Sequence, residues 1–153
     1  MRDTTGRYQM PFSKLCVLLT LTVLCAVPAA AGDEGPIAVV QSAYVDGIHR
    51  NADADAMRAG FHEDFVMYVN GDDGVTTVTR DDWAARIEKA GADPGRTTPD
   101  IAAELEIVGR SGKAAVVKVE LKRDGKHVFT DFLSLYETAG GWKIVAKIFQ
   151  RHP

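Results

Sequence analysis

Cysteine is scarce in this 153-residue chain, and its two copies, Cys16 and Cys25, both lie within the first 31 residues. A domain formed by residues 32–153 therefore contains no thiol, which excludes a disulfide framework, a thiolate nucleophile and a Cys-ligated zinc site. The sequence also lacks glycine-rich phosphate loops and the G-x-S-x-G and H-E-x-x-H motifs. Its length leaves room for one domain.

An excess of basic charge is missing as well. The chain has 18 basic and 21 acidic residues, and its aromatic residues, 8% of the total, are not interleaved with a basic patch. Non-specific nucleic-acid binding needs such a patch, so nucleic acid is not expected as a partner. Hydrophobic residues make up 46% of the chain and charged residues 25%, which is typical of a globular protein.

The first 31 residues have the pattern of a secretory signal peptide. Arg2, Arg7 and Lys14 precede an apolar run over 15–27, and small residues at 29–32 follow it. A membrane-spanning helix needs about 20 apolar residues, so a retained anchor is the weaker alternative. We predict cleavage before Gly32, a secreted or periplasmic domain over 32–153 with a net charge of −5, and no membrane association after cleavage.

Helices are expected first in the remaining chain. The spacing of Ile37, Val40, Tyr44 and Ile48 predicts an amphipathic helix over 35–50. Asp53 is a candidate N-cap for a short helix over 54–60. Thr79 resembles the first residue of a capping box for a third helix, which the glycine-rich stretch 91–95 would end.

Strands follow from an alternating pattern. A hairpin is expected from residues 65–70 and 75–79 around a turn at 70–74, and four antiparallel strands from 101–107, 115–121, 126–137 and 142–150. Helices followed by such a meander indicate an α+β fold, with three N-terminal helices packed against a strongly curved, mainly antiparallel sheet.

The expected register places two charges on an apolar sheet face. Three-residue hairpin loops at 123–125 and 139–141 would put Val117 opposite Asp131 and Leu133 opposite Lys147. Asp131 and Lys147 then become diagonal neighbours. They share this face with Ala115, Val117, Val119, Leu121, Phe129, Leu133, Leu135, Val145 and Phe149.

The opposite face of the last hairpin is also expected to be apolar. In that register it carries Val128, Thr130, Phe132, Tyr136, Trp142, Ile144 and Ile148. A large exposed apolar patch is unusual on a monomer, which favours a homodimer. The alternative is that the first helix or the 91–99 loop covers this face.

Several segments resemble one known family. They are Tyr44-Val45-Asp46-Gly47, Phe61-His62-Glu63-Asp64-Phe65, Thr130-Asp131-Phe132-Leu133-Ser134-Leu135 and the stretch 141–149. Together they resemble the nuclear transport factor 2-like superfamily, with its SnoaL-like fold, and within it the putative lumazine-binding branch. The resemblance implies a cone-shaped α+β fold, a pocket at the open end and frequent homodimers. Proteins with related folds include isomerases, cyclases and dehydratases as well as binding modules, so the fold does not determine the function.

Asp131 and His62 are the candidate catalytic residues. A desolvated carboxylate favours its protonated form and suits a general base, although Lys147 could instead neutralise Asp131 as a buried ion pair. His62 could move protons near neutral pH, or could simply cap helix carbonyls. His49 is expected to contact the end of its own helix rather than a ligand.

An apolar pocket is expected from residues Tyr44, Met57, Phe61, Phe65 and Phe129 together with Lys147, although each apolar member could be plain core. His49, Asp53 and His62 match no metal-binding motif, so we expect neither a metal nor another cofactor. The sequence thus predicts an exported protein that binds a small molecule. The alternatives are an isomerase, cyclase or dehydratase that uses Asp131 or His62, and a non-catalytic structural or interaction domain.

Overall fold

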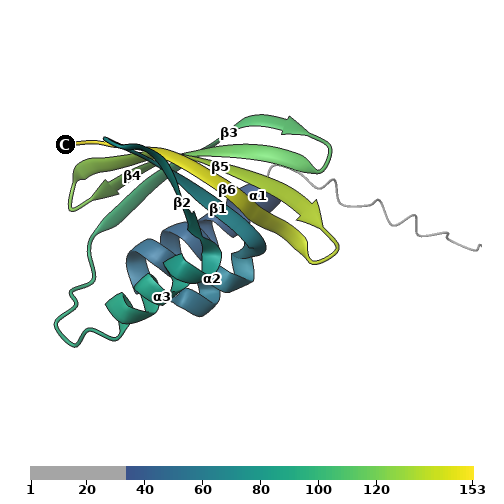
Figure 1. Ribbon diagram of the computed structural model, residues 1–153. Coiled ribbons are helices and arrows are strands. Elements are labelled where there is room, and N and C mark those ends of the chain that lie inside the picture. The colour runs from purple at the N-terminus through teal and green to yellow at the C-terminus, as the bar shows by residue number, and fades with distance from the viewer. Residues whose placement is uncertain (1–33) are drawn as a thin grey trace, which may run out of the picture.

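The computed structural model describes residues 34–153, which form a helical layer against one face of a single sheet (Figure 1). The expected signal peptide lies outside these residues. The helices are α1 (Glu34–Val39), η1 (Val40–Asn51), α2 (Ala54–Gly60) and α3 (Arg80–Gly91). The strands are β1 (Phe61–Gly71), β2 (Gly74–Thr79), β3 (Ile101–Ser111), β4 (Ala114–Arg123), β5 (Lys126–Thr138) and β6 (Gly141–Arg151).

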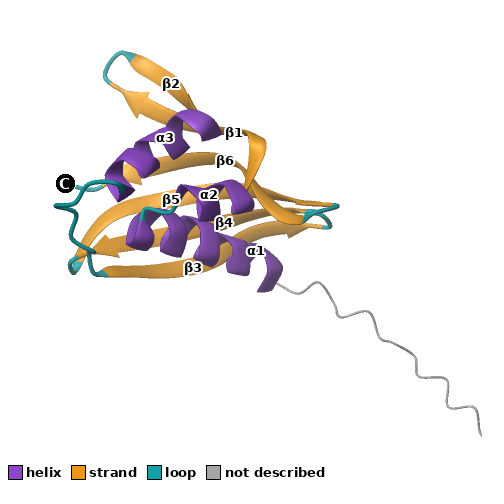
Figure 2. Cartoon of the chain, turned by 90° about the horizontal axis from the view of Figure 1, so that it is seen from below, coloured by secondary structure: helices purple, strands orange, loops and turns teal. Residues whose placement is uncertain are grey.

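The sheet has the strand order β2-β1-β6-β5-β4-β3. Strands β3 to β6 form the predicted antiparallel meander, and β1 joins its edge by pairing in parallel with β6. Figure 2 looks onto the helical layer, which covers one face of the curved sheet. The α+β class is confirmed, and α3 follows the β1–β2 hairpin, as expected from a hairpin over 65–79 and a helix that begins after Thr79.

Local sequence signals determine where the helices begin. The Asp53 carboxylate accepts hydrogen bonds from the backbone amides of Asp55 and Ala56, so it caps α2 as predicted. The Thr79 hydroxyl accepts a hydrogen bond from the Asp82 amide and donates one to the Asp82 carboxylate. Both predicted helix starts are therefore confirmed.

The helix predicted over 35–50 is present, but its longer part is a π-helix. In η1 backbone hydrogen bonds join residues five apart, and the Ala52 amide extends this pattern by donating to the Gly47 carbonyl. Residues i and i+5 consequently lie one above the other. Tyr44 and His49 are such a pair, and their ring centroids are 4.7 Å apart.

The β4–β5 hairpin differs from the prediction. Its loop has two residues, Asp124 and Gly125, both with positive φ, and β4 and β5 pair from Arg123 and Lys126 onward. A register shift at Leu121 then brings Val119, and not Val117, opposite Asp131. Because the net displacement is two residues, Asp131 still faces the helices.

A bulge in β6 corrects the predicted faces of the last strand. Leu133 pairs with Lys147 as predicted, but Leu135 pairs with Ile144, so Val145 is an extra residue. Trp142 and Ile144 therefore lie on the inner face, whereas Val145 is only partly buried. A Cβ on Gly35 would lie 2.7 Å from the Trp142 ring, which shows how closely α1 covers this tryptophan.

The outer face of the last hairpin keeps a smaller apolar group. Phe132, Tyr136 and Ile148 are exposed by 37%, 55% and 55%. Trp142 and Ile144 were expected on this outer face, but their side chains point to the inner face, so nothing needs to cover them on the outer side. The exposed apolar patch is therefore smaller than predicted.

Candidate functional site

Three polar side chains meet inside the otherwise apolar core. Tyr44 from η1 donates a hydrogen bond to Asp131 Oδ2 (2.6 Å), and Lys147 Nζ donates to the Tyr44 hydroxyl (2.7 Å). Lys147 Nζ also lies 2.8 Å from Asp131 Oδ1, an ion pair without hydrogen-bond alignment. We call Tyr44, Asp131 and Lys147 the buried triad. The predicted diagonal contact between Asp131 and Lys147 is therefore present.

Aromatic rings surround the ammonium group of Lys147. Its Nζ lies 4.7 Å from the ring centroids of Tyr44 and Phe149, 5.2 Å from that of Trp83 and 5.7 Å from that of Phe129. The faces of such rings attract a cation, which offsets part of the hydration that burial removes. Lys147 is thus held by one carboxylate and four rings.

Burial sets the charge states of the triad. Burial, reinforced by the nearby Asp131 carboxylate, raises the pKa of Tyr44 well above its ordinary value, so Tyr44 remains a neutral donor. Burial lowers the pKa of Lys147, and Asp131 opposes this shift by favouring the ammonium form. The arrangement is that of a charge pair bridged by a hydroxyl group.

A cavity of about 330 Å³ opens beside Lys147, between the helices and the sheet. Its lining comes from η1, α3, β1 and the ends of β4, β5 and β6. The lining residues are Ile48, His49, Ala52, Met67, Trp83, Arg86, Ile87, Ala90, Arg123, Phe129, Lys147, Phe149 and Arg151. The walls are thus mainly apolar and aromatic, and Lys147 connects them to the buried triad.

His49 supplies a second polar group to this cavity. Its Nε2 is buried and has no hydrogen-bond partner, although the residue as a whole is partly exposed. Burial, followed by the positive charges of Lys147 and Arg123, lowers the pKa of His49 to about 3. The imidazole is therefore neutral near pH 7. His49 is one of the residues that line the cavity, and its Nε2 atom forms no hydrogen bond with the carbonyl groups at the helix terminus.

The other residues expected in the pocket have different places. Phe129 and Lys147 line the cavity. Tyr44 lies behind Lys147, while Met57, Phe61 and Phe65 are fully buried and are not among the lining residues. Asp131 is fully buried as well and reaches the cavity only through Lys147.

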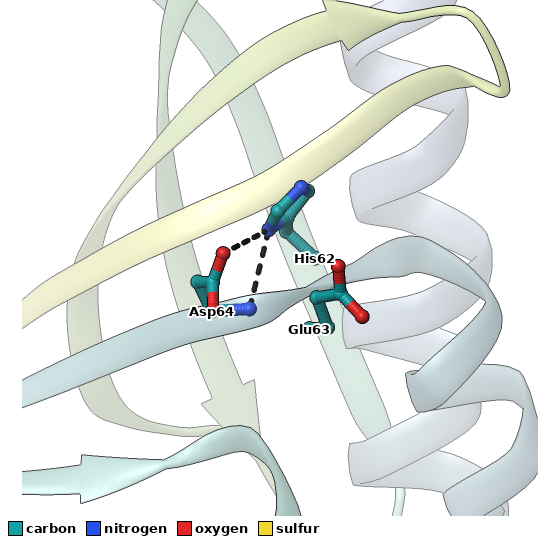
Figure 3. A group of neighbouring side chains, drawn as sticks. All are labelled: His62, Glu63 and Asp64. Carbon is teal, nitrogen blue, oxygen red and sulfur yellow. Dashed lines mark hydrogen bonds and ion pairs between the residues drawn. The ribbon is translucent and has the colours of Figure 1, made fainter.

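His62 lies outside the cavity, at the start of β1 (Figure 3). It forms a group with Glu63 and Asp64 whose potential metal ligands lie within 4.8 Å of one another. The His62 Nδ1 atom already accepts a hydrogen bond from the Asp64 amide (3.2 Å) and lies 3.6 Å from Asp64 Oδ2. Since a metal would compete for that nitrogen and both carboxylates are exposed, we assign no metal to this group. Asp53 and His49 are not part of it.

A second hollow, of about 370 Å³, is lined by parts of β3, β4 and β5. Its lining has one charged side chain, Arg110, and no histidine or carboxylate. The cavity beside Lys147 is the stronger candidate, because it combines aromatic walls with buried polar groups.

Sequence reasoning missed most of the cavity lining. Phe149 was predicted only as part of the apolar sheet face, Trp83 was given no role, and His49 was expected to contact the end of its helix. No sequence pattern pointed to the arginines of the cavity, because they are exposed residues from three distant segments. They are Arg86, Arg123 and Arg151. The i, i+5 spacing of Tyr44 and His49 would have indicated a shared face only if a π-helix had been expected.

Solved structures of nuclear transport factor 2-like proteins share this arrangement of helices and sheet. A structure of such a protein from Shewanella baltica OS155 superposes with a TM-score of 0.63 at 24% identity, over 78% of this chain and 93% of that one. Another from Silicibacter pomeroyi DSS-3 has a TM-score of 0.61 at 28% identity, over 77% and 93%. The functions of both proteins are unknown.

The chain belongs to the family described as "Putative lumazine-binding", whose model matches residues 33–150. A shorter similarity joins it to the protein called aldolase FrzH from a Cladobotryum species, with 35% identity over 54 residues. That stretch covers 35% of this chain and 43% of the aldolase, so the chain spans less than half of this relative. Within residues 34–153, no helix is long and apolar enough to cross a membrane.

Proposed function

We propose that this protein binds a small molecule with an aromatic or otherwise apolar body in the cavity beside Lys147. The observation that carries the proposal is that one cavity is lined by aromatic side chains, by the buried Lys147 and by His49, whose Nε2 atom is buried without a partner. A buried polar atom without a partner is costly, and a ligand that bonds to it removes that cost. The description of the family as lumazine-binding also favours a small-molecule ligand.

Ala90→Trp should block the cavity. Ala90 is an exposed residue of α3 that lines the cavity, so an indole at this position would fill it. Titration with the neutral dye N-phenyl-1-naphthylamine, followed by its fluorescence, should give saturable binding to the wild type. We expect the variant to bind the dye at least tenfold more weakly.

Ala85→Trp is the matched control. Ala85 is an exposed residue of the same helix, but it does not line the cavity. It should leave dye binding within about twofold of the wild type, because about 1.4 kcal/mol is needed for a tenfold change. Equal effects of the two variants would contradict binding in this cavity, and an absence of dye binding to the wild type would favour a structural or interaction domain.

Acid–base catalysis at the same cavity is a second candidate function. The observation that favours it is the partial similarity to a protein named as an aldolase, together with a buried ammonium group on the cavity wall. Lys147 would stabilise the enolate oxygen of a carbonyl ligand whose α-proton passes to His49. Binding ranks first, because a His49 pKa of about 3 makes its imidazole a weak base. Exchange of ligand α-protons with D₂O would favour catalysis.

Export and self-association complete the proposal. The pattern of residues 1–31 supports export, and N-terminal sequencing of secreted protein should then begin near Gly32. The exposed Phe132, Tyr136 and Ile148 support a homodimer through the outer sheet face. Sedimentation velocity that finds only monomer at micromolar concentrations would contradict the dimer.

A further inference from the structure

Three arginines surround the cavity from three different elements. Arg86 comes from α3, Arg123 from the end of β4 and Arg151 from the end of β6. Lys147 adds a fourth cation from the inside, whereas the lining contains no aspartate or glutamate. We call Arg86, Arg123 and Arg151 the arginine rim.

The arginine rim differs from other arginines of the molecule. Arg50 pairs with Asp46, Arg58 with Glu88 and Arg80 with Asp81. In contrast, the members of the arginine rim form no ion pair with a carboxylate of residues 34–153. Arg151 lies over the Phe129 ring, with its guanidinium carbon 5.5 Å from the ring centroid. These cations gather at one cavity although acidic residues outnumber basic ones in the chain. Their charge is thus available to a ligand.

Positive charge also acts on the groups inside the cavity. The charges of Lys147 and Arg123 both act on His49 and disfavour its protonation, in addition to the effect of burial. The neutral imidazole lines the same cavity, and its buried Nε2 atom has no protein partner. A ligand with an acidic group toward the rim would therefore meet cations there and a neutral imidazole elsewhere on the cavity wall.

The walls determine the rest of the ligand. Trp83, Phe129 and Phe149 present aromatic surfaces, and about 330 Å³ of space accommodates a molecule of roughly two fused rings rather than a long chain. Guanidinium groups bind carboxylates and related anions through paired hydrogen bonds, which a neutral ligand would leave unused.

We infer that the ligand of this cavity is an aromatic anion, with its ring system between Trp83 and Phe149 and its acidic group at the arginine rim. The inference rests on the proposed binding function and specifies the chemical class of the ligand. The acidic group can be a carboxylate, sulfonate or phosphate, since each offers oxygen atoms to the same guanidinium groups.

Two dyes that differ in one charged group test this inference. The anion 8-anilinonaphthalene-1-sulfonate and the neutral N-phenyl-1-naphthylamine share the same aromatic body. The wild type should bind the sulfonate at least tenfold more tightly than the neutral dye. Raising the NaCl concentration should weaken sulfonate binding severalfold and leave the neutral dye within about twofold.

Single substitutions locate the charge effect. Arg86→Gln, Arg123→Gln and Arg151→Gln should each weaken sulfonate binding by threefold to tenfold, and each should weaken sulfonate binding more than binding of the neutral dye. Lys113→Gln is the control, since it removes one positive charge at the exposed β3–β4 turn, outside the cavity lining. Ala90→Trp should reduce the binding of both dyes, which shows that they share the cavity.

The outcomes separate this inference from the function on which it rests. Saturable binding of the neutral dye without preference for the sulfonate would overturn the anion inference and support small-molecule binding. A sulfonate preference that survives all three arginine substitutions would also overturn it. Failure of both dyes to bind would overturn both the inference and the proposed function.

Discussion

Asp131→Asn is expected to lower the free energy of unfolding by about 3–5 kcal/mol, the cost of breaking a buried ion pair by removing one partner. Asparagine has nearly the same shape and can still accept the hydrogen bond from Tyr44. It cannot balance the charge of Lys147, which is 4% exposed. Urea denaturation followed by circular dichroism measures the loss, and the buried pair makes this the largest single effect that we expect.

Glu106→Gln is the matched control for that loss. Glu106 also pairs with a lysine across two strands, and its contact with Lys118 is likewise 2.8 Å long, but its side chain is 61% exposed. Its removal should cost far less. A triple variant with Tyr44→Phe, Asp131→Leu and Lys147→Met should recover most of the stability, because it removes all three polar groups together. Equal losses for Asp131→Asn and Glu106→Gln would contradict the description of the buried triad.

Acidification from pH 7 to pH 5 should destabilise the protein through His49 by about 2 kcal/mol. The pKa of His49 is about 3 in the folded state and about 6.5 in an ordinary, solvated histidine. Below pH 6.5 His49 binds a proton in the unfolded chain but not in the folded protein. The free energy of unfolding therefore decreases as the pH is lowered between these two values. Urea denaturation at several pH values gives the slope.

His49→Gln should flatten this slope between pH 7 and pH 5, because glutamine does not titrate. His62→Gln provides the comparison, since it also removes one histidine, but at the start of β1 and outside the cavity. The loss of slope should be larger for His49→Gln than for this variant. If His49→Gln and the wild type have parallel pH profiles, then the fold does not hold the His49 imidazole neutral, and His49 is not a neutral polar group of the cavity.

The helices and the central charge pair could be predicted because their signals are local or strictly periodic. Asp53 and Thr79 cap helices through residues two or three positions away. Asp131 and Lys147 could be placed on one face because side chains alternate along β5 and β6, and the pairing of Leu133 with Lys147 is as predicted.

The predictions of face and register that the structure corrects share one physical cause. In each case one residue is added to or removed from the regular spacing of a strand or helix. The extra residue Val145 turns Trp142 and Ile144 inward, and the two-residue loop at Asp124-Gly125 shortens the predicted hairpin. In η1 the wider helical turn brings His49 beneath Tyr44. Such changes depend on hydrogen bonding that residue patterns alone do not determine.

The cavity was harder to predict than the fold because its lining is assembled from the whole chain. Trp83 and Arg123 are far apart in sequence, and neither belongs to a recognisable motif. Only the packing of α3 against the sheet brings them to the same space. The buried triad, by contrast, could be predicted in part, since two of its three members, Asp131 and Lys147, lie on adjacent strands.

Binding of a small molecule in the cavity beside Lys147 can be observed by methyl NMR of the two methionines in residues 34–153. Met67 lines the cavity, whereas Met57 is fully buried and does not. With ¹³C-methyl-methionine labelling and N-phenyl-1-naphthylamine added to saturation, ring currents should shift the Met67 signal, assigned through Met67→Leu, and leave that of Met57 in place. A saturating dye that leaves the Met67 signal unmoved would contradict binding in this cavity.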